Sequence, residues 1–293
     1  MFMPKLVLMW TLCLFLLPVL VLQGIWVRKT TLKLPEAAHP DRGEFGEQDP
    51  PISILGLGDS VIAGVGVDKL DESLTAQIAR STAEKTGRRV TWQVYGKNGD
   101  RVSDLLARYQ NTDKGSGADL QFSNTGELLE AAVPAFLEEM MGDSAKAIQP
   151  DYVVVSVGVN DVSRLTSLTR WNFEITQVIA ELREYHGVPI IFLGIPPMGD
   201  FPALAHPLKF ALGVRAAMLD KTIQRAAELL PDIYWIDTHS LFQHGHMAAD
   251  GYHPSASGCD EMGRTIAEVV LGLERESKQK GETVQSTEGE HKE

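Results

Sequence analysis

A serine hydroxyl at the end of an apolar run is the first candidate for chemistry in this chain. The run Ile54–Leu57 is followed by Gly58, Asp59 and Ser60. Such a run is typical of a strand buried on both faces of a parallel sheet. The turn after it would place the Ser60 hydroxyl at the C-terminal edge of the sheet, where open α/β sheets bind ligands. A turn of this composition also occurs without any catalytic role, so the assignment depends on what else the chain supplies.

Asp250 and His253 could provide the acid and the base that a serine nucleophile requires. A hydroxyl is a weak nucleophile until a base takes its proton, and the base needs an acid that fixes its tautomer and orientation. The two residues are three positions apart, so a single turn can bring the carboxylate to the imidazole. Two other aspartates, Asp59 and Asp161, are expected to hold the backbone of their own turns instead.

Further strand ends carry groups that could bind the oxyanion formed during acyl transfer. Gly99 and Asn160 each follow a predicted strand. The backbone N–H groups of Ser60 and Gly99 and the side-chain amide of Asn160 are therefore three candidate donors. Glycine suits such a place because the absence of a Cβ atom lets the backbone approach closely. Gly96 is an alternative to Gly99 as the glycine donor.

The order of these groups resembles that of the SGNH (GDSL-type) hydrolase superfamily. The matching segments are, in chain order, Gly58–Ser60, Gly99, Gly158–Asp161, and Asp250 with His253. The resemblance extends over roughly residues 50 to 272. It implies a flavodoxin-like, three-layer α/β/α fold and the hydrolysis of esters by a Ser-His-Asp triad. It also implies that Ser60, Gly99 and Asn160 form the oxyanion hole.

We therefore expect a serine esterase or lipase-like hydrolase that acts on small-molecule, lipid or sugar esters through an acyl-enzyme. This chemistry needs no cofactor and no metal ion. Two alternatives stay open. The same residues would serve an acyltransferase or a carbohydrate O-deacetylase, and the sheet could instead carry a non-catalytic binding module. His244 and His246 could begin a metal site, although a loop before the Asp250 turn explains them more simply.

Alternating strands and helices predict a parallel sheet with helices on both faces, an α/β sandwich of three layers. Five parallel strands are expected, at residues 52–57, 90–95, 151–157, 188–193 and 233–236. Helices are expected near residues 71–86, 101–110, 126–141, 169–185, 208–230 and 256–273. Residues 111–125, rich in Gly, Ser, Asn and Asp, are expected to form a surface excursion.

The composition is that of one globular domain with an acidic surface. Of the 293 residues, 44% are hydrophobic, which is enough for a full core. The formal net charge of -12 argues against nucleic acid as a partner and mildly against a strongly anionic substrate. Cys13 and Cys259 are far apart in different kinds of segment, so we expect no internal disulfide.

The first 30 residues differ from the rest in their hydrophobicity. Residues 6–27 are almost wholly apolar, and at about 1.5 Å per residue they would span the hydrocarbon core of a membrane. We expect a membrane anchor with the catalytic domain outside the cytoplasm; a cleaved signal peptide and a secreted domain are the alternative. Beyond residues 1–30, we expect a linker at 31–50, the hydrolase domain at 51–273 and a disordered polar tail at 274–293.

Overall fold

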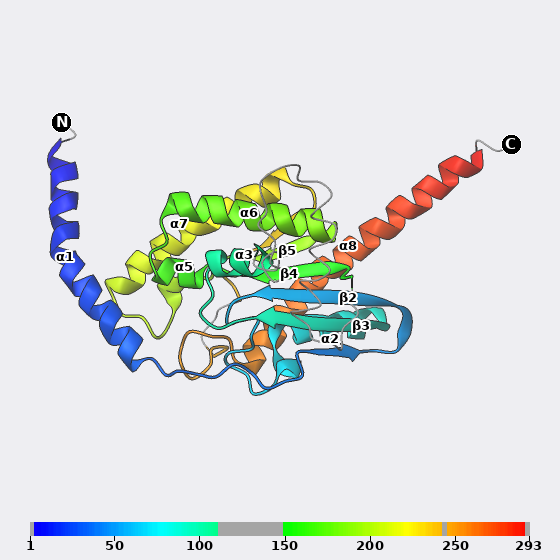
Figure 1. Ribbon diagram of the computed structural model, residues 1–293, viewed down its shortest axis with the longest axis horizontal. Coiled ribbons are helices and arrows are strands. Elements are labelled where there is room, and N and C mark those ends of the chain that lie inside the picture. The colour runs from blue at the N-terminus through cyan, green and yellow to red at the C-terminus, as the bar shows by residue number, and fades with distance from the viewer. Residues whose placement is uncertain (1–2, 111–148, 242–244, 291–293) are drawn as a thin grey trace, which may run out of the picture.

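The computed structural model describes residues 3–110, 149–241 and 245–290 (Figure 1). These residues form three layers, with helices on both faces of a central sheet, as predicted. The helix predicted near 126–141 and the surface excursion predicted at 111–125 lie outside the described residues.

The central layer is a sheet of six described strands in the order β1-β3-β2-β4-β5-β6. The strands are β1 (Arg42–Phe45), β2 (Gln48–Gly58), β3 (Arg88–Gly96), β4 (Tyr152–Ser156), β5 (Ile190–Leu193) and β6 (Ile233–Ile236). Strands β2 to β6 run parallel and confirm the five strands predicted from the sequence. Strand β2, which leads to Ser60, lies between β3 and β4, so three adjacent strands deliver their loops to one edge.

Strand β1 was not predicted. It lies within residues 31–50, which were expected to form a linker, and it pairs antiparallel with β3. Four residues of mixed polarity give no periodic signal, so contacts with neighbours define this strand. Gly43 lies against the ring of Trp92, where a Cβ atom would come within 2.9 Å. The Arg80 guanidinium lies 4.7 Å from the centre of the Phe45 ring.

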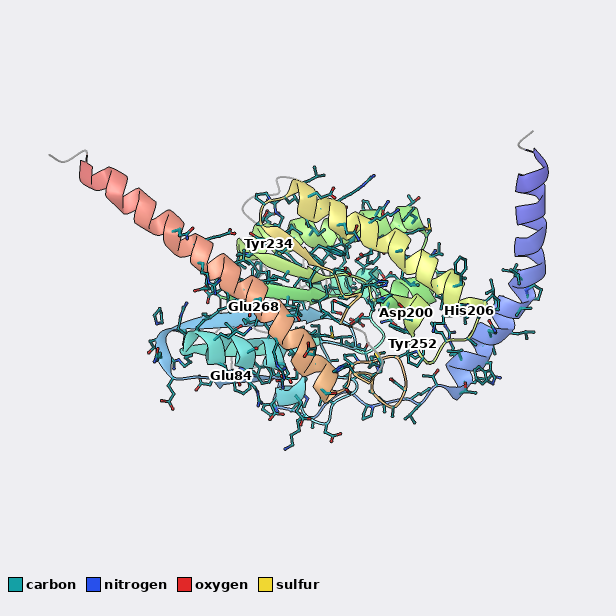
Figure 2. The ribbon with its side chains drawn as sticks, turned by 180° about the vertical axis from the view of Figure 1, so that it is seen from behind. Glu84, Asp200, His206, Tyr234, Tyr252 and Glu268 are labelled. Carbon is teal, nitrogen blue, oxygen red and sulfur yellow. The ribbon has the colours of Figure 1, made fainter. Side chains whose placement is uncertain are left out.

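The described helices divide between the two faces of the sheet (Figure 1). On one face, α2 (Leu74–Thr86) packs along α8 (Ala256–Glu290). The other face carries α3 (Val102–Gln110), α5 (Val159–Ser163), α6 (Leu168–His186) and α7 (Leu208–Leu229). Figure 2, the view from behind, shows α8 lying alongside α2. Two short 3₁₀ turns, η1 (Leu70–Glu72) and η4 (Met198–Asp200), lie in the connecting loops.

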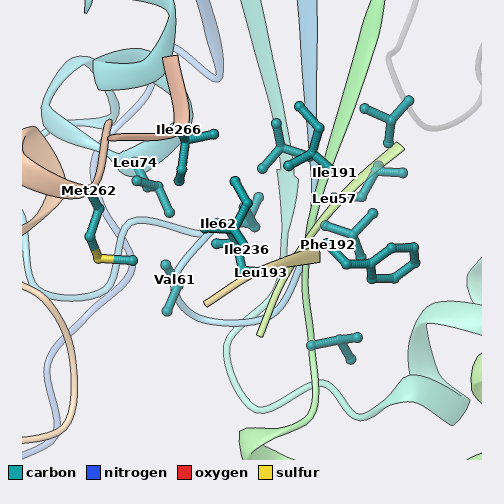
Figure 3. Packing of buried hydrophobic residues seen from close by; sticks show 14 of the residues in the cluster. Leu57, Val61, Ile62, Leu74, Ile191, Phe192, Leu193, Ile236, Met262 and Ile266 are labelled. Carbon is teal, nitrogen blue, oxygen red and sulfur yellow. The ribbon is translucent and has the colours of Figure 1, made fainter. Parts of the chain in front are cut away.

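The core is continuous across the sheet, because both faces of the parallel strands are covered. Every residue of β4 and β5 is buried, which explains why these strands read as unbroken apolar runs. The largest fully buried side chains include Trp171, Phe192 and Phe201. Figure 3 shows Phe192 and Leu57 within this packing. Each such side chain contributes roughly 1.5–3 kcal/mol through removal of its apolar surface from water.

Helix α8 is longer than predicted. It was expected to end near residue 273 and to be followed by a disordered tail, whereas the helix continues to Glu290. Glu274 accepts a hydrogen bond of 2.8 Å from the Tyr152 hydroxyl and also pairs with the Arg88 guanidinium. These contacts fix the helix to β3 and β4 where the tail was expected to begin. The Glu, Lys and Gln residues beyond this point favour helix by their intrinsic propensity.

Helix α1 (Met3–Thr30) lies beside the three layers and contacts them through its C-terminal half (Figure 1). The Gln23 amide donates to the His206 carbonyl at 2.8 Å, and its oxygen accepts from the Leu208 N–H at 3.1 Å. Figure 2 shows His206 next to this helix. The side chains of residues 3–15 lie outside the described part of the chain. Over the residues that are described, no helix combines the length and hydrophobicity of a membrane span, so the predicted anchor is not supported.

Candidate active site

Ser60 lies in the turn after β2, at the middle of the C-terminal edge of the sheet. Gly58 ends the strand with φ at 144°, and a Cβ atom there would lie 1.8 Å from the Ser156 carbonyl oxygen. Only glycine fits this position. The turn closes when the Val65 N–H donates to the Ser60 carbonyl at 2.9 Å. The sequence thus makes an abrupt bend that presents the Ser60 hydroxyl at the end of the strand.

The apolar residues after Ser60 anchor this turn in the core. Val61 is 8% exposed and Ile62 is fully buried. Figure 3 shows both side chains near Leu74 of α2 and Met262 of α8. The turn at residues 58–66, named here the nucleophile turn for the predicted role of Ser60, is therefore packed against the same two helices that cover this face of the sheet.

Asp59 supports the nucleophile turn from inside. Its Oδ1 accepts hydrogen bonds from the Val61 N–H and from the Ser156 hydroxyl, both at 3.2 Å. Burial raises the pKa of Asp59 to about 6, although these hydrogen bonds and the nearby His253 act in the opposite direction. The contacts agree with the supporting role predicted for Asp59, as distinct from that of the acid beside the base.

The side chains of Ser60, His253 and Asp250 form one hydrogen-bonded chain. Nε2 of His253 lies 2.8 Å from Oγ of Ser60, and Nδ1 lies 2.6 Å from Oδ2 of Asp250. The other oxygen of Asp250 accepts the backbone N–H groups of Tyr252 at 2.9 Å and of His253 at 3.1 Å. Burial alone would raise the pKa of Asp250, but these hydrogen bonds, led by that of the imidazole, bring it below its ordinary value. Asp250 is therefore an anion at neutral pH.

The turn that carries His253 is held on two sides. Gly66, at the end of the nucleophile turn, has φ at 107°, and a Cβ atom there would lie 2.3 Å from the Pro254 carbonyl oxygen. The same atom would lie 3.3 Å from Cβ of His253. On the other side, the Tyr252 ring packs edge-to-face on Phe201, with 5.5 Å between ring centres. The backbone at Gly66 therefore packs against the turn that carries the imidazole, at a distance that leaves no room for a side chain.

The two candidate glycine donors occupy different environments. Gly96 pairs with Gly58 inside the sheet, and a Cβ atom on it would come within 2.2 Å of the backbone nitrogen of Ala63. Gly99 follows in the open turn, with φ at 87°. Within the described residues, the N–H groups of Gly99 and Ser60 donate no hydrogen bond. Gly99 is therefore the better candidate, because it lies in the turn whose Asp100 carbonyl binds the Asn160 amide, whereas Gly96 still belongs to the strand.

Asn160 and Asp161 tie their loop to the turn that contains Gly99. The Asn160 amide donates to the Asp100 carbonyl at 3.0 Å, which uses one of its two N–H groups. The Asp161 carboxylate is fully buried and accepts the Val102 N–H at 2.9 Å and the Thr166 hydroxyl at 2.8 Å. Burial raises the pKa of Asp161 above its ordinary value. Asp161 thus has the supporting role that the sequence predicted.

Two supports of these loops were not predicted. Arg215 of α7 donates to the carbonyl of Val162 at 3.2 Å and to that of Thr166, which fixes the end of α5. The Glu36 carboxylate, which lies before β1, accepts the N–H of Asn98 at 2.6 Å. No sequence pattern marks either residue, because both bind backbone groups that are distant along the chain.

The possible metal site was the other interpretation of the histidines near the end of the chain. His244 lies outside the described residues. His246 lies in the loop before α8, where its carbonyl accepts the Ser255 N–H at 2.8 Å. In the part of the chain that the structure describes, no three His, Cys, Asp or Glu side chains are grouped as metal ligands.

This fold, together with the family match, identifies the protein as a hydrolase that acts on ester bonds. The chain belongs to the GDSL-like lipase/acylhydrolase family, whose profile matches residues 57–260. The resemblance inferred from the four sequence segments is thereby confirmed. The match also includes the strand ends that carry Ser60, Gly99 and Asn160, and the turn with His253.

Solved structures provide the corresponding comparison of folds. The psychrotrophic esterase EstA from Pseudoalteromonas sp. is 14% identical, with a TM-score of 0.52 over 76% of this chain and 98% of that one. A lipase/acylhydrolase from Enterococcus faecalis is 20% identical, with a TM-score of 0.51 over 76% of this chain and 96% of that one. At these identities the likeness concerns the fold alone. A search of curated proteins returns no match.

Proposed function

We propose that the protein is a serine esterase in which Ser60, His253 and Asp250 act as one catalytic unit. The observation that carries the proposal is the unbroken path of two hydrogen bonds, 2.8 Å and 2.6 Å long, from the Ser60 hydroxyl to the Asp250 carboxylate. A serine, a base and an orienting acid at these distances are the parts that acyl transfer through a serine requires.

Acylation begins when Oγ of Ser60 forms a bond to the ester carbonyl carbon and Nε2 of His253 takes the hydroxyl proton. The tetrahedral intermediate then breaks its C–O bond to the alcohol, and His253 gives the proton to the departing oxygen. Water then forms a bond to the acyl carbon while His253 takes a proton from it. The bond to Oγ of Ser60 breaks and His253 gives that proton to Oγ, which releases the carboxylic acid and restores Ser60. Asp250 remains an anion throughout and balances the charge of the imidazolium.

The oxyanion of each tetrahedral intermediate is bound by three donors in this mechanism. They are the N–H groups of Ser60 and Gly99 and the second N–H of the Asn160 amide. Two observations support this assignment. Among the described residues, the two backbone N–H groups donate no hydrogen bond, and the Asn160 amide is bound to the Asp100 carbonyl in the turn that contains Gly99. Removing one donor of this kind typically costs about 10²–10³ in kcat.

Covalent labelling tests the proposal directly. We expect a fluorophosphonate probe to label wild-type protein at Ser60 and to leave Ser60→Ala unlabelled. Hydrolysis of 4-nitrophenyl esters should fall by several orders of magnitude in both Ser60→Ala and His253→Ala, because the two residues act as a unit. Ser163→Ala provides the matched control, since that exposed hydroxyl donates only to the Val159 carbonyl of its own helix. Substantial turnover by folded Ser60→Ala would overturn the proposal.

The products distinguish a hydrolase from an acyltransferase, which would use the same residues. With a 4-nitrophenyl ester in water containing a small proportion of butanol, we expect the free acid as the main product. Predominant formation of the butyl ester would assign the protein to acyl transfer instead. Chromatography of the products against standards of acid and ester provides the measurement.

A further inference from the structure

A positively charged side chain lies next to the oxyanion donors. Arg164 follows Asn160 by four positions, and its backbone N–H donates to the Asn160 carbonyl at 2.9 Å. Residues four apart in a helical turn project from the same face. A Cβ atom placed on Gly99 would lie 3.2 Å from Nη2 of Arg164, and no other atom would come within 4 Å of it. The guanidinium therefore lies directly beside Gly99, at the rim of the candidate oxyanion hole.

This guanidinium has no fixed partner among the described residues. Arg164 is exposed, and its side chain makes no hydrogen bond or ion pair there. The neighbouring arginines differ: Arg101 binds Asp104 at 3.2 Å, and Arg170 binds Glu174 at 2.7 Å. Burial would raise the pKa of Asp104, but hydrogen bonds and the charge of Arg101 lower it below its ordinary value, and the charge of Arg164 adds less to this lowering. Arg164 thus presents its N–H fork to solvent at the mouth of the site.

The charge of Arg164 is opposite in sign to the net charge of the chain. A net charge of -12 repels anions from the molecule as a whole. An unpaired arginine at the rim reverses that tendency locally, because an interaction at hydrogen-bond distance outweighs the screened field of remote charges. Guanidinium groups bind carboxylate and phosphate through two parallel N–H···O bonds, which fixes geometry as well as charge.

We propose that Arg164 is a specificity-determining residue that binds an anionic group, a carboxylate or a phosphate, on the ester substrate. The proposal rests on the proposed esterase function, and it names the substrate class of that site as esters that carry a negative charge near the scissile carbonyl. Arg164 takes no part in the covalent steps. Its contribution is to orient the substrate with the carbonyl oxygen toward Gly99 and Asn160.

A matched pair of esters tests this assignment. The mono-4-nitrophenyl ester of glutaric acid and 4-nitrophenyl pentanoate have acyl chains of equal length, and only the first carries a carboxylate. We expect Arg164→Gln to lower the ratio of kcat/KM for the anionic ester to that for the neutral ester by about 10- to 100-fold, the range of a charge-assisted hydrogen bond. Arg164→Lys should retain part of the preference, because it keeps the charge and loses the fork.

The control is Arg225→Gln, which removes the same charge from an exposed position near the far end of α7. We expect it to leave the ratio unchanged. A second pair, 4-acetoxybenzoate and 4-acetoxybenzamide, places the charge on the alcohol and shows which side of the ester faces Arg164. If Arg164→Gln leaves the ratio of anionic to neutral kcat/KM unchanged for both pairs, whether activity is retained or lost equally on both esters, the proposal is overturned. If wild-type protein is neither labelled at Ser60 nor active on any ester, the esterase function itself fails, and this inference fails with it.

Discussion

The side-chain amide of Asn160 has two N–H groups, and one of them is engaged with the Asp100 carbonyl. If the other binds the oxyanion, its hydrogen bond strengthens as charge develops, so its loss should appear in kcat. We expect Asn160→Ala to lower kcat by at least about 100-fold with a smaller effect on KM. Steady-state kinetics on a 4-nitrophenyl ester measures both constants.

Asn172→Ala is the matched control, because that amide accepts only the Thr222 hydroxyl on the outside of the helices. Thermal unfolding of both variants separates a catalytic loss from a structural one. A folded Asn160→Ala protein with normal kcat would leave Ser60 and Gly99 as the proposed donors.

Asp59 gives the stability of the protein a pH dependence of definite sign. The pKa of its carboxyl is raised from 3.8 to about 6 by burial, so between these values the native state binds more protons than the unfolded state. Its contribution to stability therefore falls as pH rises through this window. A shift of about 2 units corresponds to roughly 3 kcal/mol. We expect Asp59→Asn, which cannot ionise, to gain up to about 3 kcal/mol in free energy of unfolding relative to wild type between about pH 4 and pH 7.

Urea unfolding of wild type and variant at the two pH values measures this difference. Asp68→Asn, at an exposed carboxylate, is the control substitution and should show no comparable gain. A difference between Asp59→Asn and wild type that stays constant with pH would show that the Asp59 carboxyl does not titrate in this window.

At the scale of elements, two separate turns must meet for the site to form. Gly66, in the turn after β2, approaches the turn that carries His253. A Cβ atom on it would overlap the Pro254 carbonyl oxygen at 2.3 Å and would press on Cβ of the histidine at 3.3 Å. We expect Gly66→Ala to move the imidazole away from Ser60 and to lower kcat at least about tenfold, since small displacements of a catalytic group are costly. Fluorophosphonate labelling rates and kcat provide the measurements.

Gly187→Ala separates this contact from ordinary backbone strain. Gly187 also has a positive φ, of 61°, but a Cβ atom there would meet nothing within 4 Å. Both variants should lose roughly 1–2 kcal/mol of stability from the left-handed backbone conformation. Gly66→Ala should lose more, because its Cβ atom also meets the Pro254 carbonyl. Equal activity in the two variants would contradict a positioning role for Gly66.

Elements with a buried face were predictable, and those without one were not. The strands β4 and β5 read as apolar runs because every residue in them is buried, and β2 becomes apolar where it enters the core. Strand β1 is short and partly polar, so its local sequence does not predict its pairing with β3. At the start of the unpredicted extension of α8, Glu274 contacts Tyr152 and Arg88, and these contacts form only in the assembled sheet.

The same division applies to the site. Acyl transfer at a serine demands particular residue types at turns after strands, so the sequence alone offers candidates. They are Ser60, Asp250, His253, Gly99 and Asn160, and the structure brings the first three into one hydrogen-bonded chain. Arg215 and Glu36 act on backbone groups of distant loops, which no spacing reveals. The sequence points only weakly to Arg164. It lies four residues after Asn160, which places both residues on one face of a helical turn.

At the scale of the molecule, the segment between α1 and β2 is bound to two turns of the candidate active site. The Ala37 N–H donates to the Ala63 carbonyl in the nucleophile turn at 3.1 Å, and Glu36 binds the turn before Gly99. We expect a chain that starts at residue 31 to fold and to retain its esterase activity. A chain that starts at residue 48 also lacks β1 and should lose most of both. Circular dichroism and ester hydrolysis compare the two chains, and full activity from residue 48 onward would contradict this role.

The location of the catalytic domain outside the cytoplasm stays a prediction. Subcellular fractionation with sequencing of the mature N-terminus would decide between an intact leader helix, a cleaved signal and a cytoplasmic protein. An intact chain found only in the cytoplasm would contradict the prediction.

The separation of 193 residues between Ser60 and its hydrogen-bonded partner His253 has a consequence for biosynthesis. The central strands β2, β3 and β4, with the nucleophile and the oxyanion donors, leave the ribosome long before the turn that supplies the base. During that interval the hydroxyl has no group to take its proton, so under the proposed mechanism the nascent chain is chemically inert. By the same mechanism, ester cleavage starts only when the segment that carries His253 and α8 has docked onto the completed sheet. The order of synthesis would thus delay ester cleavage until the turn with His253 has reached Ser60.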